Sequence, residues 1–545
     1  DNDTLQLMLV SGEVLDWAIA ADSPKRVANI AETVAAVDTD AKSYAYVLPD
    51  GTVRVGNGQG HVLLSLNNKE NPFKDAMLLE GDKKMLTVMD NGELSLWDVA
   101  SGRKLLRLFS TQQGWTVMDA YGRFDGSEDA MENFSWAANE VDIPLDSFSE
   151  NYYEPGLLTN VLQNQDYLND NPNMVKNGIT LPPKVVLQLA EQQEQADSVT
   201  LQLDIFDRGG GIDTVHVYQN GKLLNNEAVV ASQQITEENK VEHRALTLKV
   251  SPGPGKNTLK VSASNDMGIE NSSTELSFDG KSKAYASSMR LLTIGIDKYS
   301  DPKLNLEYSV SDADSIGLAV KNNSKIASLK SLYNEEATKP RILAELKQLS
   351  QGAQQDVLVI YFAGHGMAVG KEWYFLPYET KMQPTVEQIA ATGITATELS
   401  DIFKDSKIQH ILLMVDSCYS GAGMDAFSKL QIGQHYFTRK LSRSLGITVI
   451  TSATKDQEAY ELKSLGHGLF TYLMAQDLQN KEASQPLTAH GIAENIVKTL
   501  PVFSKKMVGA SQEPVVYTKG NDFVLTDAKV TLKPAVPSSS KEPAQ

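Results

Sequence analysis

Two apolar segments of this sequence each end in a residue that can take part in covalent catalysis. The stretch VLVIYFAGHG, residues 357–366, closes with His365 between two glycines, and HILLMVDSCYSGAG, residues 410–423, contains Cys418, the only cysteine of the 545-residue chain. A thiolate attacks carbonyl carbons and an imidazole manages the protons. Each residue alone is also typical of a turn or a small core position. Together they predict a nucleophilic cysteine mechanism.

The position of the two residues strengthens this interpretation. Both follow runs typical of buried parallel strands, and sites in open parallel sheets form at the carboxyl ends of the strands. One helical crossover between the runs would return the chain to the same edge of the sheet. Gly364 and Gly366 permit a tight turn and a close approach of substrate. The backbone N–H groups of Gly366 and Cys418 are candidate oxyanion donors, and such donors are worth about 3–4 kcal/mol each in the transition state.

Residues 281–527 show the alternation of strands and helices that such a site requires. The apolar runs predict a mostly parallel sheet, and the amphipathic runs predict helices on its faces, with Thr338 as a helix N-cap. The expected strands are LLTIGID, LKSLYN, VLVIYFAG, ILLMVDS and ITVITSA, and the expected helices are SVSDADSIGLAVKN, TKPRILAELKQL, TATELSDIFKD and GLFTYLMAQDLQN. This segment is therefore an α/β domain.

The preceding residues predict two β-rich regions. Within residues 1–110, turn glycines at Gly12, Gly51 and Gly92 recur every 39 or 41 positions (51 − 12 and 92 − 51) before alternating strand residues. A period near 40 with an LWD segment is similar to a WD-like propeller blade, and a plain β-meander is the alternative. Three blades make an incomplete propeller. After a connector at 111–177, residues 178–280 predict an immunoglobulin-like β-sandwich. The Pro- and Ser-rich tail, 528–545, is expected to be disordered.

Composition limits the partners and the compartment. The net charge is −19 without a basic stripe, which argues against nucleic acid and anionic membranes as partners. No apolar run reaches the length of a membrane span, and one cysteine excludes an internal disulfide framework and a thiolate zinc cage. No signal peptide is visible. We expect a cytoplasmic protein, or a periplasmic or secreted one if an upstream signal was removed.

The motifs YFAGHG and DSCYSG resemble those of the caspase-like cysteine peptidases, above all the bacterial metacaspase and orthocaspase branch. The resemblance covers roughly residues 290–526 and extends to LLTIGIDKY, YSVSDADSI, EWYFLPYE and QEPVVYTKGNDFVL. WD-like repeats and a β-sandwich before such a domain are similar to multidomain bacterial members. Two positions depart from the family pattern: Ser311 stands where Asn is usual, and Ala363 stands where many metacaspases have Ser.

The resemblance implies a cysteine endopeptidase with a His365–Cys418 dyad. By the same resemblance, Asp312 and Asp416 line the P1 pocket, and two carboxylates there would favour Arg or Lys at P1 of a protein or peptide substrate. The alternatives are a helix N-terminal charge for Asp312 and a buried turn residue for Asp416. Asp314 is the neighbouring carboxylate that alignment with the family excludes.

Further expectations come from the long connection after Cys418 and from the family. That connection contains four basic residues at which self-cleavage is expected: Lys429, Arg439, Lys440 and Arg443. No cofactor and no metal site is predicted; activation by calcium, which some metacaspases need, has no residues assigned to it. Two other functions stay open. One is a related clan peptidase with another P1 preference, and the other is a non-catalytic scaffold that binds protein partners through the propeller and sandwich regions.

Overall fold

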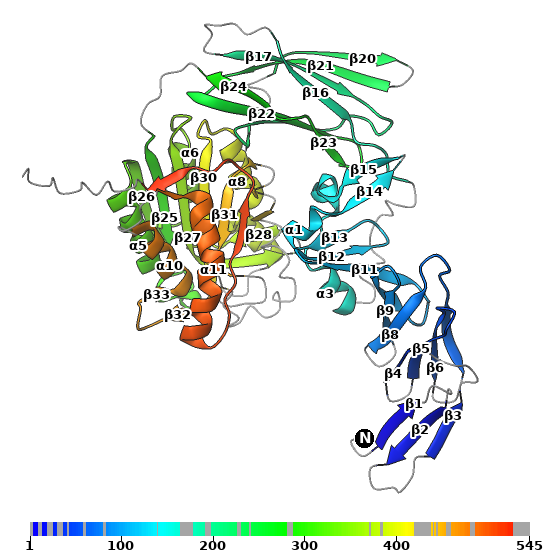
Figure 1. Ribbon diagram of the computed structural model, residues 1–545. Helices are drawn as coiled ribbons and strands as arrows, with labels where there is room; N and C mark the ends of the chain where they lie inside the picture. The colour runs from blue at the N-terminus through cyan, green and yellow to red at the C-terminus, as the bar shows by residue number, and fades with distance from the viewer. Residues whose placement is uncertain are drawn as a thin grey trace, which may run out of the picture. The chain divides into compact units, whose positions relative to one another are not determined.

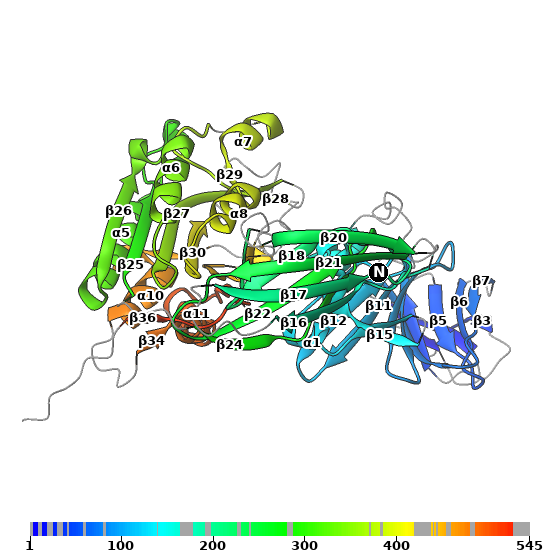
Figure 2. The same cartoon turned by 90° about the horizontal axis from the view of Figure 1, so that it is seen from above.

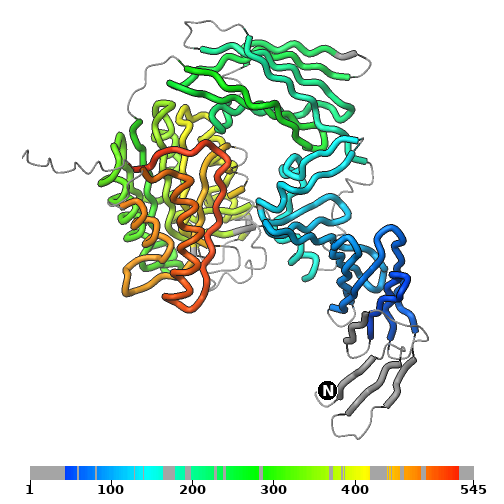
Figure 3. The backbone as a smooth tube through the Cα atoms, in the orientation of Figure 1, coloured from blue at the N-terminus to red at the C-terminus, as the bar shows by residue number. Residues whose placement is uncertain are grey.

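The computed structural model divides the chain into two compact units, which are described separately (Figure 1). Unit 1 holds Asp1–Pro182, Arg208–Gly210 and Asn265–Glu270, and unit 2 holds the rest. Figure 3 follows the backbone of the described residues. These residues are 4–8, 13–18, 25–29, 36–40, 43–57, 61–79, 83–138, 140–163, 178–190, 198–225, 230–238, 241–280, 287–369, 372–381, 385–418, 438–439, 441–442, 445–453, 459–479 and 486–526.

Unit 1 consists mainly of antiparallel sheets whose strands follow one another in chain order. The first has three strands, the second four and the third six. Short helices and one further hairpin complete the unit. The strands of the three sheets are β1 (Thr4–Met8), β2 (Glu13–Ala18) and β3 (Lys25–Asn29); β4 (Ala36–Asp40), β5 (Ser43–Val47), β6 (Val53–Asn57) and β7 (Val62–Leu66); β8 (Phe73–Leu79), β9 (Lys84–Met89), β10 (Leu94–Asp98), β11 (Lys104–Thr111), β12 (Gly114–Asp119) and β13 (Phe124–Gly126). The other elements are α1 (Glu128–Met131), β14 (Ser135–Ala138), β15 (Val141–Pro144), η1 (Leu145–Phe148), α2 (Ser149–Tyr152) and α3 (Leu157–Gln163).

The turn glycines of the predicted repeats lie where the sheets need them. Gly51 and Gly92 have φ of 77° and 84°, a conformation that favours glycine, and they precede β6 and β10. Gly12 lies outside the described residues. The six-stranded sheet runs on through β12 and β13, so residue 110, the predicted domain boundary, falls within β11. The propeller assignment itself stays a prediction.

Unit 2 begins with two antiparallel sheets (Figure 2). Buried side chains from both sheets form one hydrophobic cluster. Their strands alternate in burial, and the inward residues of both sheets, such as Leu203 and Val261, are fully buried together. The immunoglobulin-like assignment stays a prediction. One sheet has the order β16-β17-β21-β20, and the other has β19-β18-β22-β23 with β24 beside β22. Their bounds are β16 (Lys184–Leu189), β17 (Val199–Phe206), β18 (Val215–Gln219), β19 (Lys222–Leu223), β20 (Val230–Glu238), β21 (Val241–Val250), β22 (Gly255–Ser264), β23 (Glu270–Ser272) and β24 (Leu276–Gly280).

The remaining part of unit 2 is the predicted α/β domain. Its central sheet has the order β26-β25-β27-β30-β31-β35, parallel throughout except for the β31–β35 pair. The strands are β25 (Met289–Gly295), β26 (Ile326–Tyr333), β27 (Val357–Val369), β28 (Glu372–Phe375), β29 (Ile394–Thr395), β30 (His410–Cys418), β31 (Thr448–Thr451), β32 (Glu461–Leu462), β33 (His467–Gly468), β34 (Leu487–Thr488), β35 (Val515–Thr518) and β36 (Val524–Thr526). The helices are η3 (Pro302–Leu304), α5 (Ser309–Asn323), η4 (Asn334–Glu336), α6 (Lys339–Leu349), α7 (Val386–Thr392), α8 (Ala396–Lys404), α10 (Leu469–Gln479) and α11 (Ala489–Val508).

Helices cover both faces of this sheet, which explains its nearly continuous apolar strands. Alternate residues of β27 and β30, such as Ile360 and Leu413, pack with α6 and α8, whereas the intervening residues, such as Val359 and Met414, pack with α5, α10 and α11. The arrangement can be followed in Figure 2. Among the described residues, no helix is long and apolar enough to cross a membrane.

The turn between β18 and β19 reaches into the α/β domain. Leu223 is buried in the same cluster as α6, α8 and the parallel strands. Lys222 donates from Nζ to the carbonyl oxygen of Ser406, and burial lowers the pKa of its amino group to about 8. A Cβ on Gly446 would lie 1.7 Å from the carbonyl oxygen of Gly221. The β-sheet region thus completes the core of the α/β domain.

This insertion predicts that Leu223→Ala destabilises the α/β domain by about 2–5 kcal/mol, because it removes a fully packed side chain and leaves a cavity. Hydrogen exchange of the β31 amides, compared between wild type and variant, measures the effect. Ile235→Ala, at a side chain that is 57% exposed in the same β-sheet region, is the control and should change little. Equal exchange in the two variants would contradict the shared core.

Candidate active site

The pairing of β27 with β30 brings the predicted catalytic residues to neighbouring strands. In this parallel register Ala363 lies opposite Asp416 and His365 lies opposite Cys418. Neighbouring strands run about 4.8 Å apart. Cys418 is the last residue of β30, and His365 is the last residue of β27 that pairs with β30, although β27 itself continues to Val369. The side chain of Cys418 lies outside the described part of the structure.

The imidazole of His365 is buried and held by backbone and aromatic contacts. Its Nε2 lies 2.8 Å from the carbonyl oxygen of Leu304, and its backbone N–H donates to the Tyr299 hydroxyl at 2.8 Å. The Tyr299 ring packs against the imidazole at 5.0 Å between centroids. A carbonyl oxygen can only accept, so Nε2 carries a proton and Nδ1 is the nitrogen that can exchange one.

The glycines on either side of His365 make room for these aromatic contacts. Gly364 has φ of 155°, and a Cβ there would lie 2.8 Å from the Tyr299 hydroxyl oxygen. A Cβ on Gly366 would lie 2.4 Å from an indole carbon of Trp373. Both positions therefore exclude a side chain. The assignment of the Gly366 and Cys418 amides as oxyanion donors stays a prediction.

The buried side chains of Asp312 and Asp416 lie close together although the two residues belong to different elements. Asp312 is in the first turn of α5 and is 3% exposed, and Asp416 is near the end of β30 and is 6% exposed. A Cβ added to Gly468 would lie 3.2 Å from Oδ2 of Asp312 and 3.3 Å from Oδ2 of Asp416. Two carboxylates thus face the same glycine of β33.

Each carboxylate has its own hydrogen-bond donors. Asp312 lies 2.8 Å from Nδ1 of His467 and accepts the Gly468 N–H. Asp416 accepts the Thr471 hydroxyl at 2.6 Å and the Tyr361 hydroxyl at 3.4 Å. These donors offset part of the cost of burying two negative groups.

The pKa values of the acidic groups near Gly468 are shifted upward. The pKa of Asp312 is raised to about 7: burial raises it most, the hydrogen bond from His467 lowers it, and the charge of Asp416 raises it. Burial also raises the pKa of Asp416. Glu461 on β32 has its pKa raised to about 7 by burial and then by the charge of Asp416. The charge of Asp416 acts on both Asp312 and Glu461, and both of these carboxyls titrate near neutral pH.

Other predicted site residues lie elsewhere. The carboxylate of Asp314 accepts the Tyr333 hydroxyl instead of turning toward Gly468. Arg439 is 4% exposed, so in this conformation its peptide bond is not offered to a protease. Lys429, Lys440 and Arg443 lie outside the described residues. In the described part of the chain, no group of three or more His, Cys, Asp or Glu side chains is placed to hold a metal ion.

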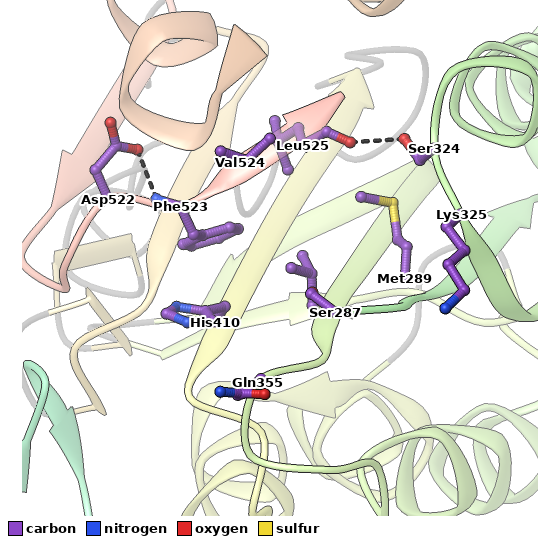
Figure 4. Close-up of a pocket in the computed structure, with 11 residues that line it drawn as sticks. Ser287, Met289, Ser324, Lys325, Gln355, His410, Asp522, Phe523, Val524 and Leu525 are labelled. Carbon is purple, nitrogen blue, oxygen red and sulfur yellow. Dashed lines mark hydrogen bonds between the residues drawn. The ribbon is translucent and has the colours of Figure 1, made fainter. Parts of the chain in front are cut away.

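A cavity of about 400 Å³ lies at the opposite edge of the sheet (Figure 4). It is lined at the beginnings of the strands by Met289, Val357 and His410. The Phe523 ring lies tilted against the His410 ring, with 5.1 Å between their centroids. Because the catalytic candidates stand at the carboxyl end of the segment in which β27 and β30 pair, this cavity is not part of their site.

Sequence reasoning missed four participants in the site. Leu304 contributes only its backbone carbonyl, which leaves no side-chain signal. Thr471 lies in a helix whose other residues show a core pattern. Glu461 and His467 lie on two-residue strands that no periodicity reveals. One signal was present: Gly466–Gly468 is a second glycine–histidine–glycine triplet, like the one around His365.

Comparison with known proteins identifies the α/β domain. Residues 289–522 match the family model of the caspase domain. This confirms the predicted caspase-like domain and implies cysteine-type peptidase activity. The metacaspase branch stays a prediction.

Comparisons with curated proteins and with solved structures do not identify the function of the other regions. No curated protein matched the chain. Among solved structures, the C-terminal WD40 domain of Sif2 is similar over 23% of this chain and 40% of its own length, with 16% identity and a TM-score of 0.17. At that TM-score the similarity does not establish a shared fold.

The contacts of His365 predict an effect of Tyr299→Phe. The substitution leaves the buried His365 N–H without its hydroxyl acceptor, at a cost of about 1–3 kcal/mol, and loosens the imidazole. We expect lower thermal stability and lower peptidase kcat. Tyr378→Phe is the control, since no described hydrogen bond uses its hydroxyl. A Tyr299→Phe variant with wild-type kcat and stability would refute the positioning role.

Proposed function

We propose that this chain is a cysteine endopeptidase of the metacaspase type that cleaves after Arg or Lys with a His365–Cys418 dyad. The observation that carries the proposal is the pair of buried carboxylates, Asp312 and Asp416, which face one glycine next to the register pair of His365 and Cys418. A caspase domain supplies the reaction class, and the two carboxylates supply the substrate preference.

The reaction begins when Sγ of Cys418 bonds to the scissile carbonyl carbon and its proton passes to Nδ1 of His365. The imidazole gives this proton to the leaving amine as the C–N bond breaks, which leaves a thioester. Water then attacks the thioester carbon and yields a proton to Nδ1. That proton returns to sulfur as the C–S bond breaks, and the free acid departs. The Leu304 carbonyl accepts a hydrogen bond from the protonated Nε2, so Nδ1 is the nitrogen that takes up and releases the proton in each step.

The charge of the pocket supports a basic P1 residue. A guanidinium can form charge-assisted hydrogen bonds to both Asp312 and Asp416, whereas an ammonium acts as a point charge. We therefore expect Arg to be cleaved at least as well as Lys. A P1 Asp would place a third negative charge in a buried site and is rejected.

The proposal extends to parts of the chain beyond the site. Protein substrates follow from the reaction, and the β-rich regions before residue 281, as WD-like blades and an immunoglobulin-like sandwich, are surfaces for protein partners. Self-cleavage after a basic residue of the 419–447 connection occurs either as the activating step or as a by-product of activity. For Arg439 this requires local opening, because the residue is buried. Activation by calcium has no residues assigned to it.

Removing the dyad should abolish turnover. Cys418→Ala and His365→Ala are each expected to lower kcat/KM for a P1-Arg peptide by at least about 10³-fold, because the two residues act as a unit. Circular dichroism and thermal melting show whether each variant is folded. The double variant should be no worse than either single one. A folded Cys418→Ala protein that cleaves at the wild-type rate would refute the mechanism.

The specificity assignment predicts separate effects for neighbouring carboxylates. Asp312→Asn and Asp416→Asn should each lose about 2–5 kcal/mol of transition-state binding for P1-Arg peptides, as when a desolvated charge pair loses a partner. Asp314→Asn is the matched control and should leave this value unchanged. The measurement is kcat/KM for Arg, Lys, Asn and Asp peptides that differ only at P1. Efficient cleavage after Asn or Asp by the wild type would overturn the assignment.

A further inference from the structure

His467 lies where a basic P1 side chain would bind. It opens β33, directly before the glycine that faces both carboxylates, and its Nδ1 is 2.8 Å from Oδ1 of Asp312. The hydroxyl of Ser311 lies 2.9 Å from the carbonyl oxygen of Gly466, which ties this hairpin to α5. The residue that departs from the family pattern at 311 thereby helps to position the histidine.

Several acidic groups lie on the elements around His467, and the turn of its own hairpin also contains Lys463. Asp312 faces it from α5, Asp416 lies behind Gly468 on β30, and Glu461 is on the partner strand β32. Glu307 and Asp297 act on Glu461 from the loop that precedes α5. Of the described residues, His467 is the one basic side chain within ion-pair distance of Asp312, and none is within that distance of Asp416.

Resting on the proposed function, we propose that His467 is a specificity-determining residue: in the free enzyme it pairs with Asp312 as an internal cation, and a basic P1 side chain displaces it with release of one proton. The side chain of His467 is 27% exposed, so the proton can pass to water. An uncharged P1 side chain does not need this exchange, so His467 sets how strongly the enzyme prefers a basic residue.

Proton linkage gives the sign of the effect. The hydrogen bond to Asp312 raises the pKa of His467, so the ion pair persists to higher pH than a free histidine would allow. A basic P1 side chain binds only when neither His467 nor Asp312 carries the proton that they share. Two coupled sites hold their last proton at least as tightly as either site would alone. Selectivity for a basic over a neutral P1 residue therefore rises with pH and then levels off. Removing the histidine's basic group moves this rise to lower pH, never to higher.

The kinetic test compares Arg with its neutral isostere citrulline at P1, because the ratio of their kcat/KM values cancels the titration of the dyad. His467→Asn keeps an N–H donor at the Nδ1 position but cannot titrate. We expect the rise in the ratio to move down by about one pH unit in this variant and the two proteins to agree at high pH. His243→Gln is the matched control, since His243 pairs with Asp204 at the same 2.8 Å distance in the β-sheet region.

Superimposable profiles, or a loss of Arg preference at every pH, would overturn the role of His467. Calorimetric titration of the Cys418→Ala protein with a P1-Arg peptide in buffers of different ionisation heat tests the same exchange without turnover. Binding should release protons at pH 6.5, and adding His467→Asn should reduce that number. A wild type that binds the peptide with proton release but does not cleave it would refute the proposed peptidase alone. Binding without proton release, or no binding, would refute the role of His467.

Discussion

The buried pair of carboxylates, Asp312 and Asp416, is the constraint that the rest of the α/β domain has to accommodate. A rise in the pKa of Asp312 from 3.8 to about 7 corresponds to about 4 kcal/mol against its ionised form. Since the folded pKa lies above the unfolded one, this group favours folding below pH 4, and its contribution is lost as the pH rises to about 7. A fold keeps such a group only if other interactions offset the cost. The sheet with helices packed on both faces provides them.

Three segments that are far apart in the sequence form the pocket around Asp312 and Asp416, and each segment is held by ordinary packing. The parallel register of β27 and β30 sets Asp416 beside Ala363, so that a slip of one residue would turn the carboxylate to the other face of the sheet. The first turn of α5 supplies Asp312. The β32–β33 hairpin closes the pocket with Gly468, where a Cβ would lie 3.2 Å from Oδ2 of Asp312 and 3.3 Å from Oδ2 of Asp416. The β18–β19 turn contributes at a distance by completing the core that carries these strands.

Much of the α/β domain could be predicted because its signals are local. Apolar runs with polar residues at their ends located β25, β27, β30 and β31, and a caspase-domain match over residues 289–522 agrees with that prediction. The convergence of Asp312 and Asp416 was predicted from the family resemblance, and the geometry brings them together. Other features of the site could not be predicted because they depend on contacts between residues far apart in the sequence. The carbonyl of Leu304 has no side-chain signature, and His467 lies on a strand of two residues.

In the β-rich regions, too, the sequence predicted local structure but not long-range contacts. Alternation and turn glycines indicated strands, and Gly51 and Gly92 adopt the expected positive φ. Periodicity did not reveal that the sheet continues beyond residue 110, because the segments after β11 read as a turn-rich connector. Nor could it show that Leu223 belongs to the core of another domain, since an apolar residue at a hairpin tip looks the same in either environment.

The most direct test of the central claim is the P1 preference of the purified full-length protein, measured with a positional-scanning peptide library with and without calcium. The account predicts cleavage after Arg, with Lys equal or weaker, no cleavage after Asp, and no activity in a Cys418→Ala preparation made in parallel. A preference for Asp, Asn or an apolar residue, with the Cys418→Ala control inactive, would contradict the role of the paired carboxylates while leaving a cysteine peptidase in place.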